Sequence, residues 1–264
     1  SPLLLVDLEG GHNPIYSSRP NDGRNSLSIP AHEVRGVGGT DNLPVGTLAY
    51  SNQVSGQILL LCGVQERLWL FETPMAVNHT PAFSDGVLCV AEMGGRIYGI
   101  DAMTGRERWH HDLIDHRGRY SYCAPAVHQG RFYAGVMRRL ARIHPQDGQV
   151  DWEKQIGGGD HDWISSYGSP AVAGELLVMT GMFSRGDSVV VVRSDDGAKV
   201  YGHPADAGML ASATIAGDQL LFTTMKSVLY CLRLGDGTPL WQTRLGSGGG
   251  DANWSATTPA VRVD

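Results

Sequence analysis

One sequence unit recurs along this chain, and it constrains the fold more than any other feature. In its clearest copy, Thr80-Pro81-Ala82 is followed by the turn Thr104-Gly105 and then by Trp109. Further copies begin at Ala124, Ser169 and Ser212. The turn glycines of the four copies are separated by 43, 49 and 40 residues: Gly105, Gly148, Gly197 and Gly237. A period of about 40 to 50 residues with four short strands per unit predicts the blades of a β-propeller.

Each part of the unit has a physical role. The Asp-Gly or Thr-Gly pair places glycine where a tight turn needs a positive φ. Alternating apolar runs such as residues 96–100 predict half-buried strands. The closing tryptophan is expected to fill the wedge between blades, where one large flat side chain buries the most area. Because no segment shows sustained helical periodicity, we predict an all-β fold.

The whole chain, residues 1–264, is predicted to form a single closed propeller of four-stranded blades. Clear repeats cover about residues 79–110, 123–153, 168–202 and 211–243, and a degenerate blade covers about 31–77. Near the N-terminus, four segments mirror the order of strands and turns in the clearest copy: 3–6, 10–11, 15–16 and 22–23. Residues 257–261 repeat the first-strand motif. We therefore assign residues 1–28 and 256–264 to one shared blade, which removes exposed sheet edges and makes six blades, with five or seven as alternatives.

This pattern resembles the PQQ-like repeat family, named after quinoprotein dehydrogenases and shared by the barrel-assembly lipoprotein of bacterial outer membranes. The resemblance spans Thr80 to Trp241 and rests on Thr-Pro-Ala, Asp-Gly, Tyr-x-x-Asp-x-x-Thr-Gly and Trp in that order. It implies a propeller fold, and a shared fold does not by itself imply a shared cofactor.

The resemblance also implies what a quinone site in this family contains. The dehydrogenases have a larger propeller, a disulfide between adjacent cysteines against the quinone, and a calcium ion held by carboxylate and amide ligands. In this chain the four cysteines lie far apart in sequence: Cys62, Cys89, Cys123 and Cys231. No calcium motif can be matched. We therefore expect no cofactor and no metal.

The amino-acid composition limits the classes of partner that this chain can bind. With 21 Lys and Arg against 27 Asp and Glu, the chain lacks the basic excess that nucleic-acid binding requires. No stretch approaches the about 20 apolar residues needed to cross a bilayer, so we expect a soluble module without membrane insertion. The isolated cysteines favour buried free thiols and a cytoplasmic compartment, and the excess of arginine over lysine suggests a bacterial source. The localisation itself stays open.

The links between blades are longer than the turns within them, and functional residues concentrate in such loops. Two links, 157–163 and 248–254, repeat the pattern Gly-Gly-Gly-Asp-x-x-Trp. They predict a polar, aromatic site for a small molecule or a protein at the channel rim, or else a brace between blades. The predicted binding residues are His79, Tyr120, Tyr122, Asp162, Trp163, Tyr167, Asp251, Asn253 and Trp254.

The densest titratable cluster is Asp160-His161-Asp162. A carboxylate beside an imidazole can tune it as a general base, so Asp160 and His161 are the candidate catalytic residues, with a solvated loop as the alternative. Adjacent strand residues face opposite sides, which argues against all three binding one metal ion. Two functions follow: a non-catalytic ligand- or protein-binding scaffold, which we favour, and a lyase, cyclase or hydrolase with its acid–base site at the channel mouth.

Overall fold

In the computed structural model, residues 2–7, 11–17, 25–27, 48–52, 57–62 and 66–68 are described as backbone strands. Side chains are described for residues 69–75, 77, 81–113, 123–136, 139–156, 169–181, 187–209 and 211–245. The described residues form 22 strands and no helix. Within this part of the chain, accordingly, no helix is long and apolar enough to span a membrane.

The strands form one two-stranded and five four-stranded antiparallel sheets, each with its strands in chain order. The two-stranded sheet pairs β1 (Pro2–Asp7) with β2 (Gly11–Ser17). The next two sheets contain β3 (Asn25–Leu27), β4 (Leu48–Asn52), β5 (Gln57–Cys62) and β6 (Glu66–Glu72), then β7 (Ala82–Ser84), β8 (Val87–Ala91), β9 (Arg96–Asp101) and β10 (Glu107–Asp112). The third and fourth contain β11 (Ala126–His128), β12 (Arg131–Val136), β13 (Arg139–Ile143) and β14 (Val150–Gln155), then β15 (Ala171–Ala173), β16 (Leu176–Thr180), β17 (Val189–Arg193) and β18 (Lys199–His203). The fifth contains β19 (Thr214–Ala216), β20 (Gln219–Thr223), β21 (Val228–Arg233) and β22 (Pro239–Arg244).

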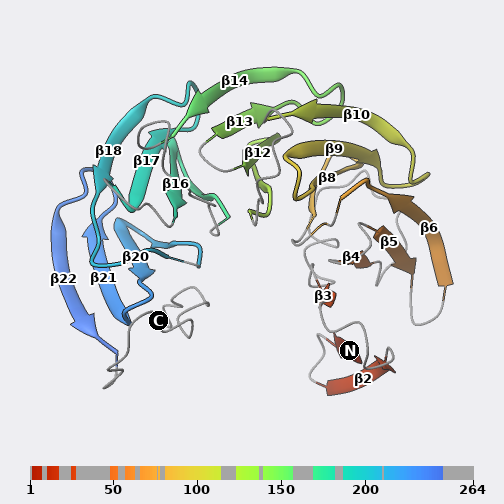
Figure 1. Cartoon of the computed structure of the whole chain (residues 1–264), viewed down its shortest axis with the longest axis horizontal. Coiled ribbons are helices and arrows are strands. Elements are labelled where there is room, and N and C mark those ends of the chain that lie inside the picture. The colour runs from red at the N-terminus through yellow and green to blue at the C-terminus, as the bar shows by residue number, and fades with distance from the viewer. Residues whose placement is uncertain are drawn as a thin grey trace.

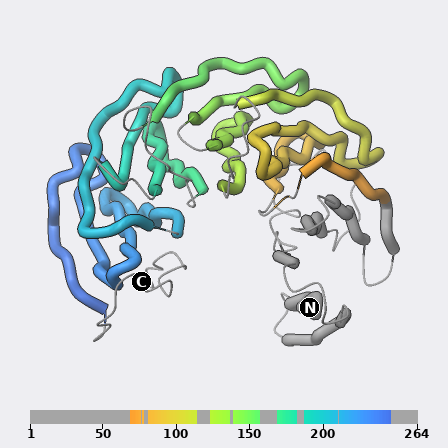
Figure 2. Tube along the Cα trace, in the orientation of Figure 1, coloured from red at the N-terminus to blue at the C-terminus, as the bar shows by residue number. Residues whose placement is uncertain are grey.

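Successive sheets follow one another around an arc, with the fourth strand of each sheet on the outside (Figure 1). The tube in Figure 2 traces the same arc through the sheets whose side chains are described. The predicted all-β class and propeller architecture are confirmed, while closure of the ring and the number of blades stay predictions. Residues 25–27, which we assigned to the shared blade, pair with β4 and belong to the next sheet. Residues 256–264 lie outside the described residues.

The core lies between neighbouring sheets. One cluster joins Val87, Ile97 and Trp109 of one sheet to Phe132 and Ile143 of the next, all of them buried. The second and third strands are therefore covered on both faces, and their sequences are continuous apolar runs such as Val-Leu-Cys-Val-Ala in β8. This arrangement explains why these segments lack the clean alternation of a half-solvated strand.

The outer-strand tryptophans join each sheet to the turn between the third and fourth strands of the next sheet. Trp69, Trp109 and Trp152 are only 8–9% exposed. Their Nε1–H groups donate to the carbonyl oxygens of Ala102 (2.8 Å), Pro145 (2.7 Å) and Ser194 (3.1 Å). In the next pair of sheets the Tyr201 hydroxyl donates to the Leu234 carbonyl at 2.9 Å. The predicted wedge-filling role of the closing tryptophan is thus confirmed for Trp109 and Trp152.

Each of these rings rests on a turn glycine whose missing side chain makes room for it. A Cβ at Gly148 (φ +71°) would lie 2.6 Å from the Trp109 ring, and one at Gly105 (φ +69°) would lie 2.6 Å from the Trp69 ring. The glycine predicted from turn geometry therefore has a second role, because it also forms the floor of the docking site.

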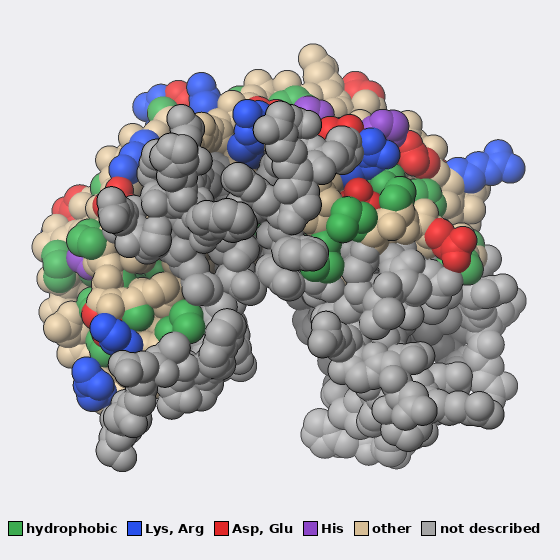
Figure 3. Space-filling model, in the orientation of Figure 1, with side chains coloured by type: hydrophobic (Ala, Val, Ile, Leu, Met, Phe, Trp, Pro, Cys, Tyr) green, Lys and Arg blue, Asp and Glu red, His purple; other side chains and the backbone are tan. Residues whose placement is uncertain are grey.

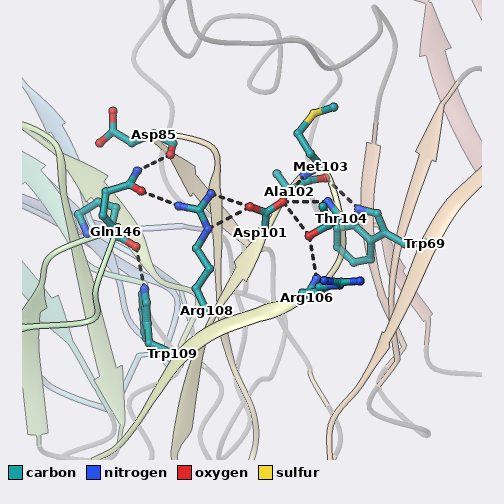
Figure 4. A network of polar contacts seen from close by, with 11 residues as sticks. Trp69, Asp85, Asp101, Ala102, Met103, Thr104, Arg106, Arg108, Trp109 and Gln146 are labelled. Carbon is teal, nitrogen blue, oxygen red and sulfur yellow. Dashed lines mark hydrogen bonds and ion pairs between the residues drawn. The ribbon is translucent and has the colours of Figure 1, made fainter.

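A polar network beside the docked tryptophans ties the same turns together (Figure 4). Arg108 Nη2 donates to Asp101 Oδ2 at 2.6 Å, while its Nη1 donates to Gln146 Oε1 of the next sheet at 2.5 Å. Gln146 Nε2 in turn donates to the Asp85 carbonyl oxygen at 2.6 Å. Neighbouring blades are thus joined by polar as well as apolar contacts at these turns.

Candidate binding surface on the rim of the inter-blade links

The antiparallel order of the strands separates the loops onto two rims. The turns between strands one and two and between strands three and four share the first rim, which we call the turn rim; there the Ala102 N–H donates to the Gly86 carbonyl at 2.9 Å. The turns between strands two and three share the second rim with the inter-blade links, and we call it the link rim. There the Leu113 N–H donates to the Gly95 carbonyl at 3.1 Å.

All of the site residues predicted from the sequence lie outside the described residues. They are His79, Tyr120, Tyr122, Asp160, His161, Asp162, Trp163, Tyr167, Asp251, Asn253 and Trp254. Their convergence on the link rim therefore stays a prediction. The structure describes other parts of the link rim, and these form the scaffold for the predicted site.

The link between β18 and β19, described except for residue 210, is held down by hydrogen bonds to the sheets on either side. Met209 N–H donates to the Gly181 carbonyl (3.3 Å), and Met225 N–H donates to the Gly208 carbonyl (2.9 Å). Thr180 Oγ1 also donates to the Ala211 carbonyl at 2.8 Å. In this link the backbone polar groups brace two blades, which is the structural alternative that the sequence left open for the links.

A buried carboxyl group lies at the link rim beside β9. Glu92 is only 3% exposed, and its Oε2 accepts hydrogen bonds from the Met75 N–H and the Tyr98 hydroxyl, both at 3.3 Å. Burial raises the pKa of Glu92 above its ordinary range, and burial likewise raises the pKa of Tyr98 to about 12. Both groups therefore favour their neutral forms, and the pair joins the link before β7 to the third strand of the same blade.

The raised pKa of Glu92 has a consequence for stability. The stability that protonated Glu92 contributes to the fold is fully present at pH values below the ordinary glutamate pKa. It is lost as the pH rises through the raised pKa that Glu92 has in the folded protein. We expect Glu92→Gln, which is neutral at every pH, to raise the midpoint of thermal unfolding relative to the wild type at about pH 7 and to lose this advantage near about pH 4. Thermal melts across this pH range measure the difference. The exposed Glu107→Gln is the control, and an equal gain in that variant would contradict the role of burial.

A second group of titratable and aromatic side chains lies between β18 and β21. The His203 ring centroid is 6.2 Å from the centroids of both Phe222 and Tyr230, and those two rings stack at 5.0 Å. Burial lowers the pKa of His203, although the negative charge of Asp187 acts in the opposite direction. Burial also raises the pKa of Tyr230. A neutral imidazole packed edge-on against two rings is suited to holding the blades together.

Sequence reasoning missed both groups. Tyr98 and Tyr230 occupy the same position of the repeat, third in the third strand, so aligning the copies would have found them. Glu92 offers no such signal, because its counterpart in the last copy is Thr224. His203 lies two residues after the docked Tyr201. In the first four-stranded sheet the equivalent residue is Phe71, two residues after Trp69, and its ring contacts the ring of Tyr98.

The described residues do not fit a quinone or metal site of the kind the repeat family implies. Cys89, Cys123 and Cys231 are buried in three different sheets or their links, so no two of them are the adjacent cysteines of the quinone site. In the part of the chain with described side chains, no group of three or more His, Cys, Asp or Glu residues is placed to hold a metal ion.

Charges of both signs are interspersed along the outer edge of the arc (Figure 3). Many form ion pairs between strands of the same sheet, such as Arg96 with Asp112 at 2.6 Å and Arg131 with Asp151 at 2.8 Å. Exposed pairs of this kind contribute little to stability. On the face that Figure 3 shows, the described outer edge is therefore mixed in charge.

Comparison with known proteins identifies relatives of this chain. A family model of PQQ-like repeats, described as outer membrane protein assembly factor BamB, matches residues 64–209, which is more than half of the chain. Among solved structures, BamB from Moraxella catarrhalis superposes with a TM-score of 0.66 at 16% identity, covering 79% of this chain and 63% of that one. At this identity the superposition shows the fold alone.

Two curated relatives are enzymes. Tetrathionate hydrolase of Acidithiobacillus ferrooxidans is 28% identical over 112 residues, which cover 42% of this chain and 22% of that protein. Quinohemoprotein alcohol dehydrogenase ADH IIB of Pseudomonas putida is 26% identical over 199 residues, which cover 71% of this chain and 27% of that protein. This chain thus matches less than a third of the length of either enzyme.

Proposed function

This chain belongs to the family described as outer membrane protein assembly factor BamB, and on that premise we propose that it is a non-catalytic protein-binding propeller. The family match over residues 64–209 is the observation that carries the proposal. A protein named as an assembly factor works through contacts with other proteins, and propellers present rigid rims for such contacts. We assign the binding surface to the link rim.

The rigidity of the described scaffold supports this assignment. Docked tryptophans join successive blades at the turn rim, and the link before β19 is tied to the sheets on both sides. A surface held in place before binding loses less conformational entropy when a partner docks. The link rim is therefore suited to recognise a protein through side chains that its longer loops present.

Within the link rim, the repeated links 157–163 and 248–254 are the proposed contact elements. Each carries a tryptophan beside polar residues, and large aromatic side chains dominate the energetics of protein interfaces. We propose that Trp163 and Trp254 anchor the partner and that Asp162, Asp251 and Asn253 surround them. His79, Tyr120, Tyr122 and Tyr167 would extend the same surface.

The double substitution Trp163→Ala/Trp254→Ala tests the surface. Proteins retained by the immobilised wild-type chain are identified by mass spectrometry, and the strongest is purified and titrated by calorimetry. We expect the double variant to weaken its binding by at least about tenfold, the loss of about 1.4 kcal/mol, since hot-spot residues each contribute about 2 kcal/mol or more. Met103→Ala is the matched control, because Met103 is 52% exposed on the turn rim. Equal affinity for the wild type and both variants would overturn the assignment.

An enzyme is the second candidate, and the similarity to tetrathionate hydrolase favours it. In that case Asp160 and His161 would act as acid–base groups at the channel mouth. Incubation of the purified chain with tetrathionate, followed by product analysis, tests this candidate directly. Turnover that is abolished by Asp160→Asn would establish a hydrolase and displace the binding module. The proposed module predicts no turnover.

A further inference from the structure

Four turns in the part of the chain with described side chains contain an aspartate followed directly by a glycine. They are Asp85-Gly86, Asp147-Gly148, Asp196-Gly197 and Asp236-Gly237. In such a pair the glycine nitrogen can attack the aspartate carboxyl carbon, because a residue without a Cβ leaves the approach open. The product is a five-membered succinimide ring, and its hydrolysis yields either aspartate or isoaspartate. The reaction therefore depends on how firmly each turn holds its two reacting groups.

Three of these turns hold the carboxyl group of the aspartate. Its Oδ1 accepts a hydrogen bond from the backbone N–H two residues further on, of Gln149 (3.0 Å), Ala198 (2.8 Å) and Thr238 (2.9 Å). A basic side chain three residues earlier lies against the same carboxyl group: His144, Arg193 and Arg233. The backbone bond lowers the pKa of Asp147 and Asp236, and the pair with Arg193 lowers the pKa of Asp196 to about 2. These groups therefore stay ionised, and an ionised carboxylate does not readily lose an oxygen.

The glycine of each of these three turns is held as well. Its N–H, which supplies the attacking nitrogen, donates to the carbonyl oxygen four residues earlier at 2.9–3.0 Å. An aromatic ring of the preceding sheet also covers it. A Cβ added at Gly148, Gly197 or Gly237 would lie 2.6, 2.8 or 2.5 Å from the ring of Trp109, Trp152 or Tyr201, respectively. Both reacting groups must be released before a succinimide can form in these turns.

The turn Asp85-Gly86 is the two-residue loop between β7 and β8, with φ +50° at Asp85 and +74° at Gly86. Within the described residues, the carboxyl group of Asp85 accepts a hydrogen bond only from the adjacent Ser84 hydroxyl, at 3.1 Å, and the Gly86 N–H donates none. A Cβ added at Gly86 would meet nothing within 4 Å, so the turn has room to move. Exposure alone does not separate this turn from the others, since Asp147 and Asp236 are exposed as Asp85 is.

We propose that the fold leaves Asp85 as a site of spontaneous isomerisation to isoaspartate, while it protects the other three Asp-Gly pairs. The Gly86 nitrogen forms a bond to the Asp85 carboxyl carbon, and the carboxyl hydroxyl leaves with the amide proton as water. Water then adds to one of the two ring carbonyls. Cleavage of the original peptide bond gives isoaspartate, and cleavage of the new bond restores aspartate. No other reactant is needed, because the water lost in the first step is regained in the second.

The modification acts on a contact between two blades. The Asp85 carbonyl oxygen accepts a hydrogen bond from Gln146 Nε2 of the next sheet at 2.6 Å, while the Asp85 carboxyl group points away from this network (Figure 4). In isoaspartate that carbonyl becomes a free carboxylate, and the paired residues Ser84 and Val87 are joined by a loop that is one backbone carbon longer. The site lies on the turn rim, so it is independent of the partner binding that we assign to the link rim.

Peptide mapping of the unmodified chain tests the site. The native protein is incubated in heavy-oxygen water at about pH 5, since loss of the hydroxyl requires a protonated carboxyl group. A parallel sample is unfolded in guanidinium at the same pH. Digestion followed by mass spectrometry with electron-transfer fragmentation then measures isoaspartate and incorporated heavy oxygen at all four Asp-Gly pairs.

In the native chain we expect Asp85 to isomerise at least about tenfold faster than the other three aspartates, because two hydrogen bonds must break first in each of their turns. In the unfolded chain this lead should disappear. Asp85→Glu is the matched control, since it keeps the charge but requires a larger ring that closes more slowly; it should lose the signal at this position and leave the other three unchanged.

Two results would refute the proposal. One is a set of equal rates at the four pairs in the native chain, which would mean that the hydrogen bonds of the turns give no protection. The other is a lead of Asp85 that persists in guanidinium, which would assign the reactivity to the neighbouring residues in the sequence and not to the fold.

Discussion

Replacing Trp109 with alanine is expected to lower the free energy of unfolding by about 3–5 kcal/mol, the largest effect of any single substitution considered for this chain. The side chain is 8% exposed and packs in the cluster that joins two sheets. Its Nε1–H donates to the Pro145 carbonyl at 2.7 Å in a buried position. The substitution therefore opens a cavity between blades and leaves a buried acceptor without its donor.

Urea unfolding followed by circular dichroism measures this loss. Trp109→Phe separates the two contributions, because it keeps an aromatic ring in the wedge and removes the hydrogen bond, so we expect an intermediate loss. Met103→Ala, at an exposed position of the turn rim, should stay within about 0.5 kcal/mol of the wild type. A loss in Trp109→Ala no larger than that of Met103→Ala would show that the blades do not depend on the docked ring.

Alanine at Gly148 is expected to lower the free energy of unfolding by about 2–5 kcal/mol, through backbone strain and overpacking together. Gly148 has a φ of +71°, and its added Cβ would lie 2.6 Å from the Trp109 ring. The ring is also held from below, since it packs over Gly99 in its own sheet. It therefore has little freedom to move away from the new methyl group.

Gly130→Ala is the matched control for this substitution. Gly130 has a similar φ of +65°, and a Cβ added there would meet nothing within 4 Å. We expect it to cost only the backbone strain, about 1–2 kcal/mol, so the difference between the two variants measures the docking contact. Equal losses in the two variants, read from the same urea titrations, would mean that Gly148 serves the turn alone.

Much of the local structure could be predicted from the sequence because its causes are local. Positive φ at Gly105, Gly148, Gly197 and Gly237 follows from the Asp-Gly and Thr-Gly turns, and the four turn positions are confirmed. Strands β4, β5 and β6 lie within the degenerate blade predicted for residues 31–77, and β3, which precedes that range, pairs with β4. That pairing was missed because residues 25–27 were placed by their neighbours in the sequence.

The candidate site was less predictable. The links carry no periodic pattern, so the sequence indicates which residue types they contain but not where the side chains point. Glu92 shows the same limit, because its hydrogen-bond partners Met75 and Tyr98 lie 17 and 6 residues away and its own sequence position gives no sign of these contacts. The proposed surface around Trp163 and Trp254 rests on repetition, and its test is the calorimetric comparison of variants.

The sequence by itself determined the repeat, the four-stranded unit, the turn glycines and the tryptophan that closes three of the four clear copies, because these depend on spacing and backbone preference within one copy. Only the tertiary structure decided what those residues contact. Trp69, Trp109 and Trp152 find their acceptors 33, 36 and 42 residues further along the chain, in the next blade. Burial and the raised pKa of Glu92 depend on which neighbouring element covers a side chain, and that is a property of the packing between blades, which no single copy of the repeat contains.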